Sequence, residues 1–252
     1  MTRRRIHYGW TVLAMATLVV FAALGLARFG YSIVLPPMQE GLSLDNMPAG
    51  GLATANRIGY LALSGIGGAR AARCGPRAGG TAGRAAAGAS MLLTGTANGF
   101  GAAALWRGVT GLGSGASNVP VMGLLAAWFA PRRRGLASGV AVAGSSLALI
   151  ALGPTVPRVL AALGDHGWRA CWFGFGALTL LLAALAFALL RDHPSDLGLG
   201  PLGEAAGGGG AMPARGALRW GAVYRCTAVW QMGLAYLAFG FSYIIYMTVT
   251  VT

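Results

Sequence analysis

The sequence predicts an all-α membrane protein in which a bundle of six transmembrane helices is followed by one further transmembrane helix. Of its 252 residues, 56% are hydrophobic and only 10% are charged, whereas soluble domains carry about 25% charged residues. The apolar residues form seven runs, each long enough to cross a hydrocarbon core of about 30 Å as a helix. Most charged residues collect between these runs, as expected where the chain leaves the membrane.

The seven predicted spans divide the chain into three parts. Six spans with short loops predict an N-terminal bundle over residues 1–190. Residues 191–227 are rich in glycine, proline and charge, which is typical of a flexible cytoplasmic linker. The last span, 228–252, reaches the final residue without a flanking charge, so we expect a truncated chain in which this helix begins a missing C-terminal bundle. The spans are predicted at about 9–35, 48–70, 79–98, 101–130, 135–157, 168–190 and 228–252.

The distribution of arginine predicts the orientation in the membrane. The chain has 19 basic residues, all of them arginine; fourteen lie on one side of the predicted membrane and two on the other. Because cytoplasmic loops carry the excess of positive charge, we expect a multi-pass membrane protein whose N-terminus and long loop after the sixth span lie in the cytoplasm. The fourteen are Arg3, Arg4, Arg5, Arg70, Arg73, Arg77, Arg84, Arg132, Arg133, Arg134, Arg191, Arg215, Arg219 and Arg225, against Arg158 and Arg169.

Other classes of function find little support. The arginines stand singly or in short clusters at the ends of apolar runs, which argues against nucleic-acid binding despite a net charge of +13. The cysteines match no metal or redox spacing, and no lysine is present to complete an ATP-binding loop. No nucleophile has a base beside it. We therefore expect no enzyme, metal or cofactor, and the predicted partners are the lipid bilayer and a small solute.

The fourth predicted span carries a polar stripe. Arg107, Gly111, Ser114 and Asn118 follow one another at intervals of four, three and four residues, which places them on one side of a helix. A charge at the centre of a membrane costs roughly 2.5–3.5 kcal/mol on insertion scales, so such residues face a bundle interior or a wet cavity. The stripe predicts that this helix lines a cavity.

Three short stretches resemble motifs of the major facilitator superfamily of secondary transporters. Residues 68–77 resemble its G-x-L-x-D-R-x-G-R-R loop, with Ala72 in place of the aspartate, and residues 107–115 match its fourth-helix motif R-x-x-x-G-x-G-x-G. A glycine-proline pair is similar to part of its fifth-helix motif. The resemblance implies a conformational role for these residues. Besides Arg107, the matching residues are Gly68, Arg73, Gly75, Arg77, Gly111, Gly113, Gly115, Gly153 and Pro154.

Residues 25–38, 53–61 and 239–248 resemble one branch of that superfamily, the poorly characterised bacterial YbfB/YjiJ transporters. Residues 7–10 and 193–198 also resemble oxalate/formate and monocarboxylate carriers. The resemblance covers nearly the whole chain, but a complete family member has twelve helices. This chain would supply the first six helices, the linker and the seventh.

Three arginines, Arg28, Arg57 and Arg107, lie at similar depths inside predicted spans, and no acidic residue does. Because arginine grips carboxylates through paired hydrogen bonds, an anionic substrate held by Arg28 and Arg107 follows as a hypothesis. Each arginine can instead serve helix packing, and Arg57 can extend to the membrane surface. The substrate-binding candidates, which equally fit helix–helix contacts, are Arg28, Arg107, Asn56, Asn118 and Tyr243.

These observations predict secondary active transport of a small organic solute by alternating access, with an organic anion as the hypothesis for its class. A coupling proton would need Arg107 or residues of the missing half. A second interpretation is a non-transporting remnant or membrane scaffold, because five helices are absent. A seven-helix receptor accounts for neither the 37-residue linker nor the transporter-like motifs. Five more apolar spans encoded downstream of Thr252 would distinguish a truncated transporter from a remnant.

Overall fold

The computed structural model describes residues 7–203 and 225–249, apart from the side chains of residues 65–74 and 242–249. It confirms the predicted all-α fold of six helical spans and one further helix, since the described residues are almost entirely helical. The chain divides into two units, Met1–Gly209 and Gly210–Thr252, which are described separately. The second unit contains the helix α9 (Thr227–Val249).

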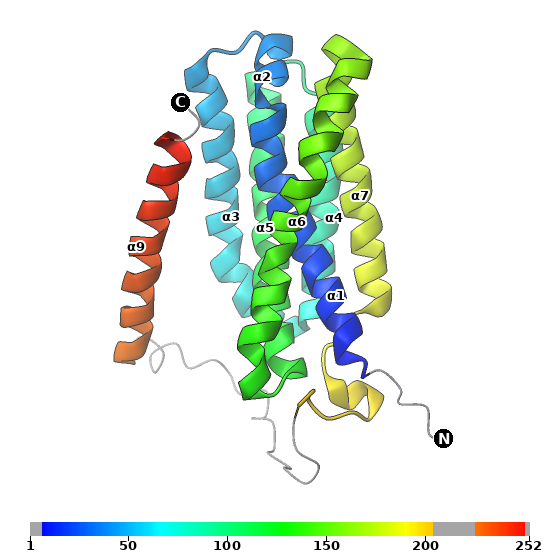
Figure 1. Ribbon diagram of the computed structural model, residues 1–252, viewed down its shortest axis with the longest axis vertical. Helices are drawn as coiled ribbons and strands as arrows, with labels where there is room; N and C mark the ends of the chain where they lie inside the picture. The colour runs from blue at the N-terminus through cyan, green and yellow to red at the C-terminus, as the bar shows by residue number, and fades with distance from the viewer. Residues whose placement is uncertain (1–6, 204–224, 250–252) are drawn as a thin grey trace. The chain divides into compact units, whose positions relative to one another are not determined.

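The first unit is a bundle of long helices (Figure 1). Its first span is one continuous helical run made of α1 (Gly9–Val20), the π-helix η1 (Phe21–Phe29) and α2 (Gly30–Leu42). The following helices are α3 (Asn46–Cys74), α4 (Pro76–Gly95), α5 (Phe100–Trp128), α6 (Pro131–Leu163) and α7 (Gly167–Leu189), with the short 3₁₀ turns η2 (Gly164–His166) and η3 (Pro194–Leu197). At 1.5 Å per residue, α5 is about 43 Å long, which is sufficient to cross a membrane.

Proline and left-handed backbone positions set several helix ends. Pro76 and Pro131 stand in the first turn of α4 and α6, where a missing N–H costs nothing. Ser43 ends α2 in the left-handed region, with φ of 50°. The first span is longer than predicted because α2 continues through Pro36 and Pro37. Helix α6 begins four residues before its predicted start, because the arginines that follow Pro131 form its first turn instead of a loop.

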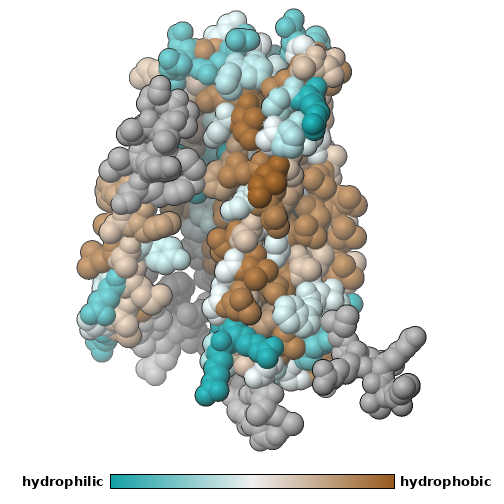
Figure 2. Space-filling view, in the orientation of Figure 1, coloured by the Kyte–Doolittle hydropathy of each residue, from teal (hydrophilic) through white to brown (hydrophobic). Residues whose placement is uncertain are grey.

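Apolar side chains cover the middle of the bundle surface, and hydrophilic ones gather at its two ends (Figure 2). Large side chains such as Leu105, Ile150 and Leu181 are exposed, which is expected for a surface that lipid surrounds. Among the described helices, the segments Gly9–Leu42 and Pro131–Leu189 contain windows with mean hydropathies of 2.2 and 2.1. This surface fits a protein whose solvent is the bilayer.

Glycines allow α5 to pack tightly between α3 and α4. A Cβ atom on Gly111 would overlap the carbonyl oxygen of Asn56, and one on Gly115 would crowd that of Tyr60, both on α3. A Cβ atom on Gly113 would overlap the carbonyl oxygen of Gly83 on α4. Such close backbone approach is typical of membrane helix pairs with small residues in their contact. The motif glycines of α5 therefore fix the neighbours of the helix that carries Arg107.

Candidate functional site

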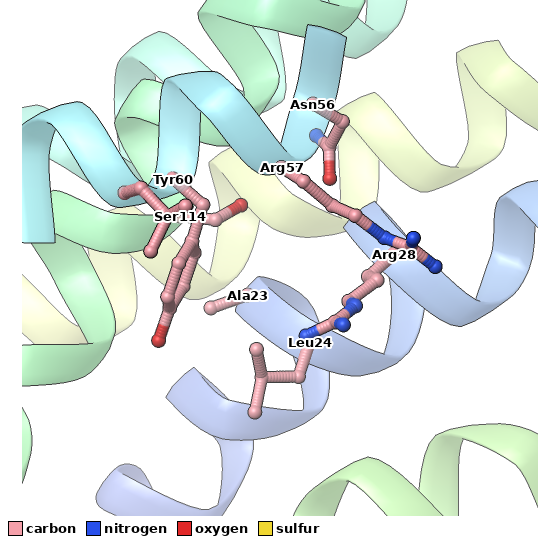
Figure 3. Close-up of a pocket in the computed structure, with 8 residues that line it drawn as sticks. Ala23, Leu24, Arg28, Asn56, Arg57, Tyr60 and Ser114 are labelled. Atoms are coloured by element: carbon pink, nitrogen blue, oxygen red, sulfur yellow. The ribbon is translucent and has the colours of Figure 1, made fainter. Parts of the chain in front are cut away.

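A cavity of about 210 Å³ lies between the first span, α3 and α5. Its lining comes from η1, α3 and one residue of α5 (Figure 3). The lining residues are Ala23, Leu24, Arg28, Asn56, Arg57, Tyr60, Leu61 and Ser114. Two of the three arginines predicted inside spans, Arg28 and Arg57, therefore share one cavity. Such a mixture of apolar walls with a few polar groups is typical of small-molecule sites.

Arg28 reaches the cavity from the π-helical segment η1. A π-helix has one more residue per hydrogen-bonded ring than an α-helix, so it changes the direction in which side chains leave the backbone; such segments are frequent at functional sites. Gly25 lets η1 approach α6, because a Cβ atom there would overlap the Cβ atom of Ala148. The Arg28 side chain is half-buried. Local backbone geometry thus places a cation at the cavity wall.

Neither cavity arginine has a charge partner among the described residues. No hydrogen bond or ion pair joins Arg28 or Arg57 to another residue in the described part of the chain. None of the five acidic residues in the described ranges lines the cavity. Two guanidinium groups with unused donors therefore meet at one site, where an anion would find both charge and hydrogen-bond donors.

Arg107 lies behind the cavity wall and is 1% exposed. Its Nη1 donates a hydrogen bond of 2.7 Å to the carbonyl oxygen of Ala27, and its own carbonyl accepts one of 3.1 Å from the Asn56 amide. Its Cζ lies 4.5 Å from the ring centroid of Tyr31 and 5.1 Å from that of Trp172, so aromatic faces stabilise the cation where no described acid does. Arg107 thus bonds to the residues that precede Arg28 and Arg57; its predicted contact with substrate finds no support in this cavity.

The other predicted polar candidates support the cavity or lie outside the described side chains. The Asn118 amide donates a hydrogen bond of 2.9 Å to the hydroxyl of Tyr60, a lining residue. Asn56 lines the cavity and also bonds to Arg107. Tyr243 belongs to α9, but its side chain lies outside the described residues. Of the polar stripe of α5, Ser114 lines the cavity, whereas Arg107 and Asn118 form hydrogen bonds with the lining residues Asn56 and Tyr60.

The segment 68–77, which resembles the G-x-L-x-D-R-x-G-R-R loop, leads into a helix start that has an unpredicted cap. Gly75 has a φ of +86°, and a Cβ atom there would lie 2.6 Å from Oδ2 of Asp192. Oδ1 of Asp192 accepts a hydrogen bond of 2.8 Å from the backbone N–H of Arg77, at the start of α4. The Arg77 guanidinium donates to the carbonyl of Phe187 and lies over its ring. The loop is thus tied to the end of α7.

Other motif residues have fewer contacts. Gly68 and Arg73 lie in α3, but their side-chain positions fall outside the described residues. Gly153 and Pro154 are exposed on α6, and a Cβ atom on Gly153 would meet nothing within 4 Å. In the described bundle, the surface of α6 at Gly153 therefore has room for a side chain.

Residues 191–203, which we name the strap, pack onto the ends of the bundle helices. The backbone N–H of Leu202 donates to the carbonyl of Trp128 at 2.8 Å, and the Trp128 indole N–H donates to the carbonyl of Arg191 at 2.9 Å. His7 bonds to the Gly200 carbonyl at 3.1 Å. These contacts correct the expectation of a flexible linker for its first part, because backbone hydrogen bonds fix this segment despite its composition.

Arg84 is a second buried cation that the sequence analysis assigned to the cytoplasmic flank. It lies in α4, is 2% exposed, and donates from Nη2 to the hydroxyl of Thr81 at 3.0 Å. Gly80 leaves room for its guanidinium group. Its burial could have been predicted from its position inside the third predicted span, 79–98.

Comparison with known proteins gives a family and one curated relative. The family model of the Major Facilitator Superfamily matches residues 16–252. The probable sulfoacetate transporter SauU of Cupriavidus necator is 26% identical over 251 residues, which cover 98% of this chain and 57% of that protein. The chain therefore spans little more than half the length of this relative.

Solved structures with similar folds are also transporters. A bacterial homologue of the human lysosomal transporter Spinster, inward-facing and unoccupied, matches with a TM-score of 0.63 and 20% identity over 74% of this chain and 44% of its own. The proton:xylose symporter XylE, bound to 6-bromo-6-deoxy-D-glucose, matches with a TM-score of 0.61 and 15% identity over 74% of this chain and 46% of its own. These likenesses show the shared fold alone. They do not test the resemblance to the YbfB/YjiJ branch, which stays a prediction.

Proposed function

The chain belongs to the Major Facilitator Superfamily, and we propose that it forms the substrate-binding first half of a secondary transporter for a small organic anion. The observation that carries the proposal is the cavity lined by Arg28 and Arg57, whose guanidinium groups have no partner among the described residues. The solute named for the Cupriavidus relative, sulfoacetate, is itself an organic anion, which supports this class. The family places the chain among membrane transporters.

Arg28 would be the first contact for the acid group of the solute. Its guanidinium can donate two parallel hydrogen bonds to a carboxylate or sulfonate, and such charge-assisted bonds contribute about 1.5–3 kcal/mol each. Tyr60, whose hydroxyl accepts a hydrogen bond from Asn118, can donate its own O–H to the acid group. The Ser114 hydroxyl, which donates to the carbonyl of Thr110, belongs to the wall. Leu24 and Leu61 would contact the carbon chain of the solute.

Transport would proceed by alternating access, in which two six-helix halves rock about a site near the middle of the membrane. Residues 1–190 would form the first half, residues 191–227 the cytoplasmic linker, and residues 228–252 the start of the second half. The excess of arginine on one side favours an N-terminus in the cytoplasm, and the resemblance to bacterial YbfB/YjiJ transporters favours the bacterial inner membrane. Proton coupling would require Arg107 or groups in the second half.

A second candidate is a remnant or scaffold that does not transport. Both candidates can bind an anion, so transport itself separates them. A twelve-helix protein that carries this chain as its first half should exchange labelled anion across proteoliposomes. Absence of exchange in that longer protein would favour the scaffold.

Anion binding can be tested on the 252-residue protein in lipid nanodiscs by calorimetric titration. Sulfoacetate should bind, and xylose, a neutral solute, should bind far more weakly. Replacing Arg28 by glutamine should raise the dissociation constant roughly ten- to a hundredfold. Arg158→Gln is the matched control, because Arg158 is an exposed arginine on α6 that does not line the cavity. Equal affinity for anions and neutral solutes would contradict the proposal.

A further inference from the structure

We infer that the cavity selects small dianions that carry an acid group at each end, with Arg57 holding the second acid group. This rests on the proposed function and deepens it by naming the substrate class. Arg57, and not Arg107, lines the cavity together with Arg28. The two side chains come from different elements, η1 and α3, and both are labelled in Figure 3.

Arg107, which is buried next to the cavity, forms hydrogen bonds with the residue before each of these two arginines. Ala27, which precedes Arg28, accepts a hydrogen bond from the Arg107 side chain. Asn56, which precedes Arg57, donates to the Arg107 backbone. One buried residue therefore bonds both to the backbone before Arg28 and to the side chain before Arg57. Two cations from different elements of one cavity favour a ligand that carries two negative groups.

Charge balance points to the same ligand class. Two guanidinium groups in one cavity repel each other, and none of the eight lining residues is acidic. Arg28 is half-buried and Arg57 is exposed. A monoanion would pair with one arginine and leave the hydrogen-bond donors of the other unused. A dianion gives each cation its own acceptor. The volume of about 210 Å³ equals that of about seven water molecules, which suits a short dicarboxylate or sulfocarboxylate.

The experiment compares dianions with monoanions that differ only at one end. Sulfoacetate is paired with ethanesulfonate, and succinate with butyrate, so that a methyl group replaces one acid group. Titrations at constant ionic strength use the 252-residue protein in nanodiscs and the variants Arg57→Gln, Arg57→Lys and Arg158→Gln. The parent should bind each dianion roughly ten- to a hundredfold more tightly than its matched monoanion.

Arg57→Gln should reduce that ratio to about one, because the second acid group of the dianion loses its partner and the dianion is weakened far more than the monoanion. Arg57→Lys, which keeps the charge without the planar fork, should restore part of the ratio. The control Arg158→Gln should keep the parent's ratio. If the parent binds both members of each pair equally, or if Arg57→Gln weakens both equally, the selectivity inference is wrong and the proposed function stands. If neither anion binds, the proposed function fails together with the inference.

Discussion

The side chain of Arg107 donates a hydrogen bond of 2.7 Å to the carbonyl oxygen of Ala27, the residue before Arg28. This bond joins α5 to the π-helical segment η1, where the backbone departs from regular α-helical geometry. The same arginine accepts a bond from Asn56, the residue before Arg57. We therefore propose that Arg107 is a positioning residue for the cavity arginines, through its side chain next to Arg28 and through its backbone carbonyl next to Arg57.

Replacing Arg107 by glutamine should weaken anion binding although its side chain does not line the cavity. The change removes a charge-assisted hydrogen bond and two aromatic contacts, so we also expect a stability loss of about 1–3 kcal/mol. Met91→Ala is the control, because Met91 is fully buried and does not line the cavity; it should lower stability without changing affinity. Titration of folded protein decides the role: an unchanged dissociation constant in Arg107→Gln would make Arg107 a structural brace only.

Replacing Gly111 by alanine should destabilise the bundle. The new Cβ atom would overlap the carbonyl oxygen of Asn56, and forced overpacking typically costs about 1–3 kcal/mol. Gly123→Ala is the matched control on the same helix, since a Cβ atom there meets nothing within 4 Å. Thermal denaturation in detergent should show a lower midpoint for the first variant only. Similar midpoints for both would mean that α3 and α5 are not in close contact.

Removing the carboxylate of Asp192 should loosen the start of α4. Asp192→Ala leaves the N–H of Arg77 without its acceptor, and loss of such a cap costs about 0.5–2 kcal/mol. Asp192→Asn, which keeps an acceptor oxygen, should have a smaller effect. Asp165→Ala, at an exposed turn, is the control. Hydrogen exchange should become faster at Arg77 in Asp192→Ala; unchanged protection there would refute the cap.

Labelling of single cysteines in intact cells should support a cytoplasmic N-terminus and linker. In a background without Cys74, Cys171 and Cys226, a membrane-impermeant reagent should modify Asp45→Cys and leave Ala205→Cys unmodified. The reason is the excess of arginine on the linker side of the predicted membrane. Labelling of both after the membrane is opened serves as the control. The reverse pattern in intact cells would invert the topology.

The helices could be predicted from sequence because long apolar runs leave a membrane chain few alternatives. The face of α5 that carries Arg107 and Ser114 was also predictable from periodicity. Periodicity does not reveal which neighbour fills the space beside each residue, so it could not separate the lining Ser114 from the buried Arg107. That distinction depends on η1, whose π-helical geometry has no local sequence signal.

The strap and Arg84 show the same limit. Composition predicted a flexible segment from residue 191 onward, but the bonds that hold Leu202 run to Trp128, far away in the sequence. Arg84 was assigned to the flank because arginine usually stays near water. Its burial depends on the small neighbour Gly80 and on the hydroxyl of Thr81.

The alternating glycines of α5 also restrict how the helices of the bundle can move. Gly111 and Gly115 face α3, whereas Gly113, about 160° around the helix axis, faces α4. Rotation of α5 about its own axis would turn larger side chains toward two backbones at once. Sliding by less than a full turn would do the same. We therefore expect α3, α4 and α5 to move together as one rigid body, with any hinge of the bundle outside them.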